Sequence, residues 1–177
     1  MKCYRQVVPG YTLGVAKGHC GRPRILSCVL EPSKRALPEQ ATRPISTAAD
    51  AAVFAQVIIG NLARETFIVM FLNNANCLIS WDSFTHGEIA SATVSPDVVA
   101  RGAVLVGAVG VITAHNHPSG VVTPSSDDEH VWKQITQRCQ CLGIRHLDNL
   151  VLGDMDYYAS SLSQLQPLPE PVIKKRG

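Results

Sequence analysis

The chain has 177 residues, of which 46% are hydrophobic and 17% charged, and its formal net charge is +2. This length is enough for one domain with a sizeable core, and the low charged fraction excludes a fully disordered chain. A net charge near zero excludes a strongly basic nucleic-acid binder that neutralises phosphates over its whole surface. The six Cys and six His leave a metal site, disulfides or neither open.

Residues 1–44 carry scattered Pro and Gly with little periodicity, so we expect an irregular N-terminal arm with one short strand at Arg24–Leu30. The next segment predicts a helix over Ala48–Ala63, because its apolar residues recur at helical spacing. Thr47 and Asp50 have the spacing of a capping box at the start of that helix, with Asp in place of the usual Glu.

The run Thr66–Leu72 is rich in β-branched and aromatic residues and predicts a central strand. A turn at residues 73–76 and a hairpin partner at Cys77–Phe84 follow it. A weaker strand is expected at Ile89–Val94.

Two further helices are predicted, each from an N-cap residue followed by proline. The first starts at Ser95-Pro96 and runs to about Val109, and the second starts at Thr123-Pro124 and runs to Cys141 or Leu142. Between them, Val111–His115 predicts a short buried strand. Cys139 and Cys141 are two apart in the second helix and point to different faces, which disfavours them as a metal pair.

A last hairpin is expected from Ile144–Leu152 and Tyr157–Ser161, followed by a Pro-rich basic tail at residues 164–177 that we expect to fray from Gln166. The pattern predicts a mixed α/β domain over residues 45–163. No segment has the length of about 20 apolar residues that spans a bilayer, and no signal peptide is visible. We therefore expect a cytoplasmic protein with no membrane partner and with cysteines that are free thiols.

The segment from 113 to 128 carries the chemistry. His115 and His117 are two apart, so both imidazoles project to one side of an extended chain, and Pro118 keeps His117 extended. Ser125 and Asp128 are three apart in the first turn of a helix. Singly, each is more often a loop or cap residue, but together they offer the two imidazoles and one carboxylate that suit a catalytic zinc.

This segment resembles the JAMM motif of JAB/MPN metalloproteases, H-x-H-P-x6-S-x-x-D. The sequence His-Asn-His-Pro-Ser-Gly is similar to the motif of the RadC-like branch of this superfamily. Residues 64–72 and 147–153 resemble the first core strand and the closing hairpin of that branch. The resemblance implies a JAB/MPN, cytidine-deaminase-like fold. Such a fold has a curved, mostly antiparallel sheet flanked by helices, with Zn²⁺ at its edge.

The resemblance also implies roles for individual residues. His115, His117 and Asp128 match the zinc ligands, and Ser125 matches the serine that helps to hold the oxyanion. Glu65 matches the upstream glutamate that takes a proton from the attacking water, and its alternative interpretation is a surface charge at a strand end.

Two other carboxylates, Glu88 and Glu129, lie in positions that do not match the family pattern. Asn149 stands where the branch usually has a histidine, which bears on substrate recognition more than on metal binding.

From these residues we expect a zinc-dependent hydrolase that cleaves a peptide or isopeptide bond in a peptide or protein substrate. The alternative is a metal-containing DNA-repair accessory or binding module without protease activity, and an inactive scaffold ranks last. Strong nucleic-acid binding is not expected, and a homo-oligomer is left open.

Overall fold

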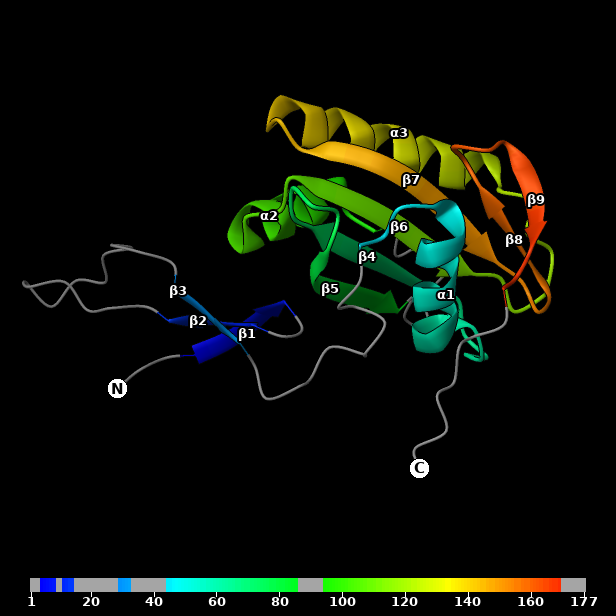
Figure 1. Cartoon of the computed structure of the whole chain (residues 1–177), viewed down its shortest axis with the longest axis horizontal. Coiled ribbons are helices and arrows are strands. Elements are labelled where there is room, and N and C mark those ends of the chain that lie inside the picture. The colour runs from blue at the N-terminus through cyan, green and yellow to red at the C-terminus, as the bar shows by residue number, and fades with distance from the viewer. Residues whose placement is uncertain (1–3, 9–10, 15–28, 33–43, 86–93, 170–177) are drawn as a thin grey trace, which may run out of the picture.

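A six-stranded sheet with helices on both faces forms the main body of the protein (Figure 1). The computed structural model describes residues 4–8, 11–14, 29–32, 44–85 and 94–169. In sheet order the strands are β5 (Leu78–Thr85), β4 (Thr66–Leu72), β6 (Gly110–Asn116), β7 (Arg145–Leu152), β8 (Asp156–Ala159) and β9 (Gln164–Pro167). All neighbours pair antiparallel except β6 and β7, which are parallel. The expected mixed α/β fold with a mostly antiparallel sheet is confirmed.

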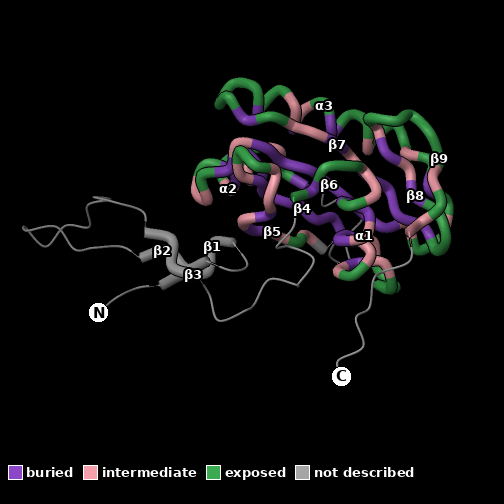
Figure 2. Tube along the Cα trace, viewed as in Figure 1, coloured by how far each residue is buried: buried purple, intermediate pink, exposed green. Residues whose placement is uncertain are grey.

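The helices form two layers, because alternate residues of the central strand face opposite sides of the sheet. Helix α1 (Ala48–Ile59) packs on the face that carries Ile68 and Met70. Helices α2 (Pro96–Val106) and α3 (Ser126–Cys141) cover the face that carries Val69 and Phe71. Strand β4 is therefore buried along its whole length, as the tube in Figure 2 shows. This double burial explains why its sequence is a continuous apolar run.

The predicted capping box of α1 is confirmed. Thr47 Oγ1 accepts a hydrogen bond from the Asp50 backbone N–H at 3.1 Å, and Asp50 Oδ2 accepts one from the Thr47 N–H at 2.9 Å. The helix ends at Ile59 with Gly60 as its C-cap, rather than at Ala63. Glycine in a helix interior is disfavoured, so the helix stops before the apolar periodicity does.

The start of α3 differs from the expectation. Its N-cap is Ser125 rather than Thr123, because Ser125 and Asp128 satisfy each other's backbone N–H groups in a second capping box. Helix α2 ends at Val106, somewhat before Val109. None of the described helices has the length and apolar character needed to cross a membrane.

Short edge strands account for the other differences. The tail was expected to fray from Gln166, but Gln166 and Pro167 belong to β9, which pairs with β8. Pro167 is tolerated because it ends an edge strand. Of the strand expected at Ile89–Val94, residues 89–93 lie outside the described part, and Val94 is buried outside any strand.

The N-terminal arm contains a three-stranded antiparallel sheet instead of one short strand. It consists of β1 (Tyr4–Val8), β2 (Tyr11–Gly14) and β3 (Val29–Pro32). Residues 24–28 of the strand expected at Arg24–Leu30 lie outside the described residues. The dipeptide Pro9-Gly10 is the sequence signal that separates the first two strands.

Candidate metal centre

Two histidines converge at the end of β6, where the strand emerges from the centre of the sheet. His115 Nε2 and His117 Nε2 lie 3.1 Å apart. His115 is only 1% exposed, and its ring stacks on Phe67 with the ring centroids 6.1 Å apart. The expected projection of both imidazoles to one side is observed, and a rigid buried strand fixes their separation.

The tautomer of His117 is set by a backbone contact. Its Nδ1 lies 2.5 Å from the carbonyl oxygen of Val121. A carbonyl can only accept a hydrogen bond, so Nδ1 carries the proton and Nε2 presents a lone pair toward His115. A histidine whose second nitrogen donates to a carbonyl is the usual arrangement of a metal ligand.

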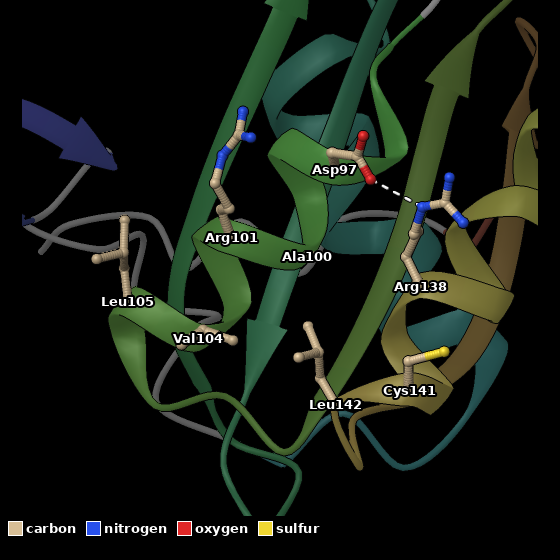
Figure 3. A pocket seen from close by; sticks show the side chains of 8 residues that line it. All are labelled: Asp97, Ala100, Arg101, Val104, Leu105, Arg138, Cys141 and Leu142. Atoms are coloured by element: carbon tan, nitrogen blue, oxygen red, sulfur yellow. Dashed lines mark hydrogen bonds and ion pairs between the residues drawn. The ribbon is translucent and has the colours of Figure 1, made fainter.

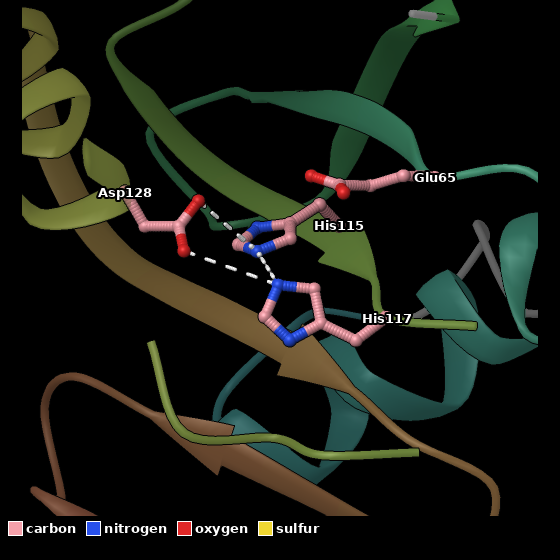
Figure 4. A group of neighbouring side chains, drawn as sticks. All are labelled: Glu65, His115, His117 and Asp128. Atoms are coloured by element: carbon pink, nitrogen blue, oxygen red, sulfur yellow. Dashed lines mark hydrogen bonds and ion pairs between the residues drawn. The ribbon is translucent and has the colours of Figure 1, made fainter. Parts of the chain in front are cut away.

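Asp128 approaches the histidine pair from the N-terminal turn of α3 (Figure 4). Its Oδ1 lies 3.3 Å from His115 Nε2, and its Oδ2 lies 3.9 Å from His117 Nε2. Ser125 Oγ donates to Asp128 Oδ2 at 2.6 Å, and the Ser125 backbone N–H donates to the same oxygen at 2.8 Å.

These contacts keep the Asp128 carboxylate ionised. Desolvation by burial acts to raise the pKa of Asp128, but the hydrogen bonds from Ser125 and the attraction of His115 and His117 outweigh it. The pKa therefore lies below its ordinary value. An ionised carboxylate at a helix N-terminus is also favoured by the helix dipole.

Glu65 completes the group from the segment that precedes β4. One ligand atom from each of four side chains lies within 4.8 Å of every other, namely those of Glu65, His115, His117 and Asp128. The pairing of β4 with β6 explains this approach, because Phe67 lies opposite His115 and the same register extended by two residues brings Glu65 opposite His117. Figure 4 shows the Glu65 carboxylate beside His115.

The competing carboxylates do not enter this group. Glu129 is exposed on α3, and Glu88 lies outside the described residues. The structure thus brings together Glu65 and the three motif residues His115, His117 and Asp128, as expected from the sequence. Their roles as ligands and base stay predictions. Asn149 lies elsewhere on β7, where it accepts a hydrogen bond from Thr113 Oγ1 at 2.6 Å.

The donor set fits a small divalent metal. Ligand atoms about 2.0–2.1 Å from a tetrahedral zinc lie roughly 3.3 Å from one another. The separations of 3.1 Å between the imidazole nitrogens and 3.3 Å from His115 Nε2 to Asp128 Oδ1 are close to this value, and the 3.9 Å from His117 Nε2 to Asp128 Oδ2 is longer. Two imidazoles and one carboxylate suit zinc and also other first-row divalent metals.

An apolar wall adjoins the buried side of the histidine pair. Trp132 of α3 lies with its ring centroid 6.2 Å from that of His115 and stacks on Tyr158 at 6.4 Å. Val122 and Val151 pack in the same cluster. This wall keeps water from one side of the site and lowers the local dielectric there.

Sequence reasoning missed one residue of the site. Asn116, between the two histidines, is 3% exposed, and its side chain bonds to the backbone on both sides of Glu65. The available signal was a polar residue directly after the segment Val111–His115, which was expected to be a buried strand, since a buried polar group requires partners.

A pocket lies between α2 and the C-terminal half of α3 (Figure 3). Arg138 Nε binds Asp97 Oδ1 at 2.8 Å across it, and Val104 and Leu142 line it with exposed apolar side chains. Asp128 is ten residues before Arg138 on the same helix, about 15 Å along its axis, so this pocket is separate from the candidate metal centre.

The sheet topology, the helix layers and the four converging side chains define a JAMM-type metal-hydrolase fold. The chain belongs to the RadC-like JAB domain family, whose family model matches residues 45–166. The match ends inside β9, two residues beyond the start of that strand.

Bacterial relatives support this assignment. The chain is 43% identical over 96 residues to a UPF0758 protein of Actinobacillus pleuropneumoniae. The aligned region covers 54% of this chain and 44% of that relative. It is also 38% identical over 133 residues to a UPF0758 protein of Saccharophagus degradans. That aligned region covers 74% of this chain and 59% of the relative. The chain therefore spans about half the length of the curated relatives it matches.

Proposed function

We propose that this protein is a zinc-dependent hydrolase that cleaves a peptide or isopeptide bond. The observation that carries the proposal is the convergence of Glu65, His115, His117 and Asp128, whose ligand atoms lie within 4.8 Å of one another. Membership of the RadC-like JAB family supports the same chemistry.

Three residues would hold the metal, namely His115, His117 and Asp128. When bound, a zinc ion lowers the pKa of water toward neutrality and polarises a scissile carbonyl. The buried strand and the Ser125 contacts fix these side chains in advance, so little reorganisation accompanies metal binding.

Glu65 is the proposed proton carrier. Its carboxylate lies beside the histidine pair, with an oxygen within 4.8 Å of the ligand atoms of the other three side chains, so it is close enough to act on a water molecule held at this site. It accepts the proton that this water loses and delivers it to the leaving nitrogen of the amide. General acid–base catalysis of this kind contributes about 10²–10⁴ to the rate.

Ser125 is the proposed donor to the oxyanion that forms on the scissile carbonyl. Its hydroxyl now donates to Asp128 Oδ2 at 2.6 Å, so it also orients that carboxylate. The backbone N–H of Ser125 holds the same oxygen at 2.8 Å. The hydroxyl proton can therefore rotate toward the oxyanion while Asp128 keeps a hydrogen-bond donor.

The metal content of the purified chain tests the proposal. We expect about one equivalent of zinc per chain, and His115→Ala should lose it. His130→Ala is the matched control, because His130 is an exposed histidine of α3 outside the group of four. Protein that stays metal-free after zinc is supplied would contradict the proposal.

Activity is then sought with a library of peptide and isopeptide substrates, assayed with and without a chelator. Cleavage that the chelator abolishes and zinc restores supports the hydrolase, and cleavage that the chelator leaves unchanged opposes it. The alternative of a DNA-repair accessory module is tested by binding to duplex DNA at two salt concentrations. With a net charge of +2, we expect weak binding without a steep salt dependence.

A further inference from the structure

One buried side chain joins the metal-binding strand to the segment that carries Glu65. Asn116 lies between His115 and His117, and successive residues of a strand face opposite ways, so its amide points away from the histidine pair. Its Nδ2 donates to the carbonyl oxygens of Leu62 at 2.9 Å and Arg64 at 3.2 Å. Its Oδ1 accepts from the backbone N–H of Thr66 at 2.8 Å.

These bonds start where the sheet pairing stops. The ladder between β4 and β6 runs from Leu72 and Gly110 to Phe67 and His115. One residue further, the Asn116 side chain takes over and bonds to the chain on either side of Glu65. Thr66 Oγ1 also donates to the Arg64 carbonyl at 3.2 Å, which tightens the same turn.

The chemistry of this position is specific to asparagine. Both amide hydrogens face carbonyls and the amide oxygen faces an N–H, so the orientation of the amide is fixed by its partners. Aspartate would keep the acceptor but place a carboxylate against two carbonyl oxygens. Glutamine is one methylene longer in a site that is 3% exposed, and alanine has no polar atom.

We propose that Asn116 is a positioning residue for the catalytic proton transfer, because it fixes the backbone on both sides of Glu65 relative to the metal-binding histidines. The catalytic part of this inference rests on the proposed role of Glu65. The statement that Asn116 fixes the backbone beside Glu65 depends only on the hydrogen bonds described above. A displacement of about 1 Å of a catalytic group can lower turnover by roughly 10²-fold. Since Asn116 faces away from the ligand atoms, its loss should leave metal affinity nearly intact.

The test compares Asn116→Ala with Asn73→Ala in the full zinc-loaded chain. Asn73 is a matched control, because it is a partly buried asparagine whose side chain also bonds to backbone groups, those of Ala75 and Cys77, in the turn at the other end of β4. Amide hydrogen exchange of residues 62–66, zinc affinity, kcat and KM are measured for each protein. In Asn116→Ala we expect at least tenfold faster exchange at Thr66 and a fall in kcat of about 10–10²-fold with KM little changed. Zinc affinity should change less than about threefold in Asn116→Ala, and Asn73→Ala should change neither the exchange at Thr66 nor kcat.

Two results would overturn the proposal. Unchanged exchange at Thr66 would show that the amide does not fix this segment, and an equal loss of zinc affinity and kcat would show that Asn116 acts through the histidines. If Asn116→Ala does not fold, Asn116→Asp replaces it, since aspartate keeps the size and the acceptor. Asn116→Asp should also lower kcat, and full activity would contradict the role of the two donated bonds.

Failure of the proposed function gives a different result. An unmodified protein that binds zinc but cleaves no substrate removes the hydrolase proposal. The exchange measurement still decides whether Asn116 holds the Glu65 segment.

Discussion

The Ser125 hydroxyl donates to Asp128 Oδ2 at 2.6 Å, and the Asp128 backbone N–H donates back to Ser125 Oγ at 3.2 Å. The second of these bonds and the bond from the Ser125 backbone N–H to Asp128 Oδ2 at 2.8 Å form the capping box of α3. It also aims Asp128 Oδ1 at His115, 3.3 Å away. The spacing of three residues between the serine and the aspartate therefore serves both the helix start and the orientation of the proposed metal ligand.

Replacement of Ser125 by alanine should affect stability and metal binding together. We expect Ser125→Ala to lower the free energy of unfolding of the metal-free protein by about 1 kcal/mol, the typical cost of a lost N-cap. Zinc affinity should fall by about 10–10²-fold, as for other outer-shell partners of a ligand. Denaturant unfolding and a zinc competition titration measure the two effects. Ser126→Ala, at the exposed next position, is the control and should change neither.

Replacement of Glu65 separates a proton carrier from a ligand. We expect Glu65→Gln to bind zinc with about the same stoichiometry and to lose about 10²–10⁴ in turnover, because the amide cannot take up a proton. Glu129→Gln, an exposed carboxylate next to Asp128, should keep full turnover. A zinc-free Glu65→Gln protein would identify Glu65 as a ligand, and an active one would exclude it as the base.

His146 should make the stability of the fold depend on pH. Burial between α3 and β7 lowers the pKa of His146 to about 4, and its Nδ1 lies 2.8 Å from Thr136 Oγ1. The Thr136 hydroxyl donates to the Trp132 carbonyl, so it accepts from Nδ1–H of the neutral imidazole.

Because the unfolded state takes up the His146 proton near pH 6.5 and the native state only near pH 4, stability falls as pH decreases across this interval. The neutral ring contributes on the order of 3 kcal/mol above pH 6.5, and this is lost by about pH 4. Denaturant unfolding of metal-free protein at several pH values measures it. His146→Gln should lose correspondingly less stability over the interval, whereas His130→Gln should follow the unmodified protein. Equal slopes for both variants would contradict the assignment.

Gly153 holds the loop that follows the histidines close to the sheet. A Cβ at this position would lie 2.7 Å from the Gly120 carbonyl oxygen and 2.7 Å from Val122 Cγ1. Gly153→Ala should therefore displace the loop that carries the Val121 carbonyl, cost about 1–3 kcal/mol of stability and weaken zinc binding through His117. Met155→Ala on the same turn is the control, since Met155 is 78% exposed. Thermal unfolding and zinc titration compare the two variants.

Short sequence patterns predicted the secondary-structure elements that are determined by neighbouring residues in the chain. The capping box at Thr47 and the doubly buried strand Thr66–Leu72 were expected at the positions where they occur. The N-cap of α3 was misplaced because Thr123 and Ser125 both carry capping side chains, and only the Asp128 contacts select between them. The strand β9 was missed because a short edge strand with one exposed face has no apolar pattern to identify it.

The sequence by itself determined which side chains are candidates to bind a metal. Alternation along an extended chain puts His115 and His117 on one side, and a spacing of three residues puts Ser125 and Asp128 on one helix face, because these relations depend only on local backbone geometry. The family resemblance indicated Glu65, but only the tertiary structure decided that its carboxylate lies beside these side chains and that Asn116 bonds to the backbone on both sides of it. The pairing register of β4 and β6 spans some fifty residues of chain and depends on burial of the whole sheet, which no local periodicity encodes.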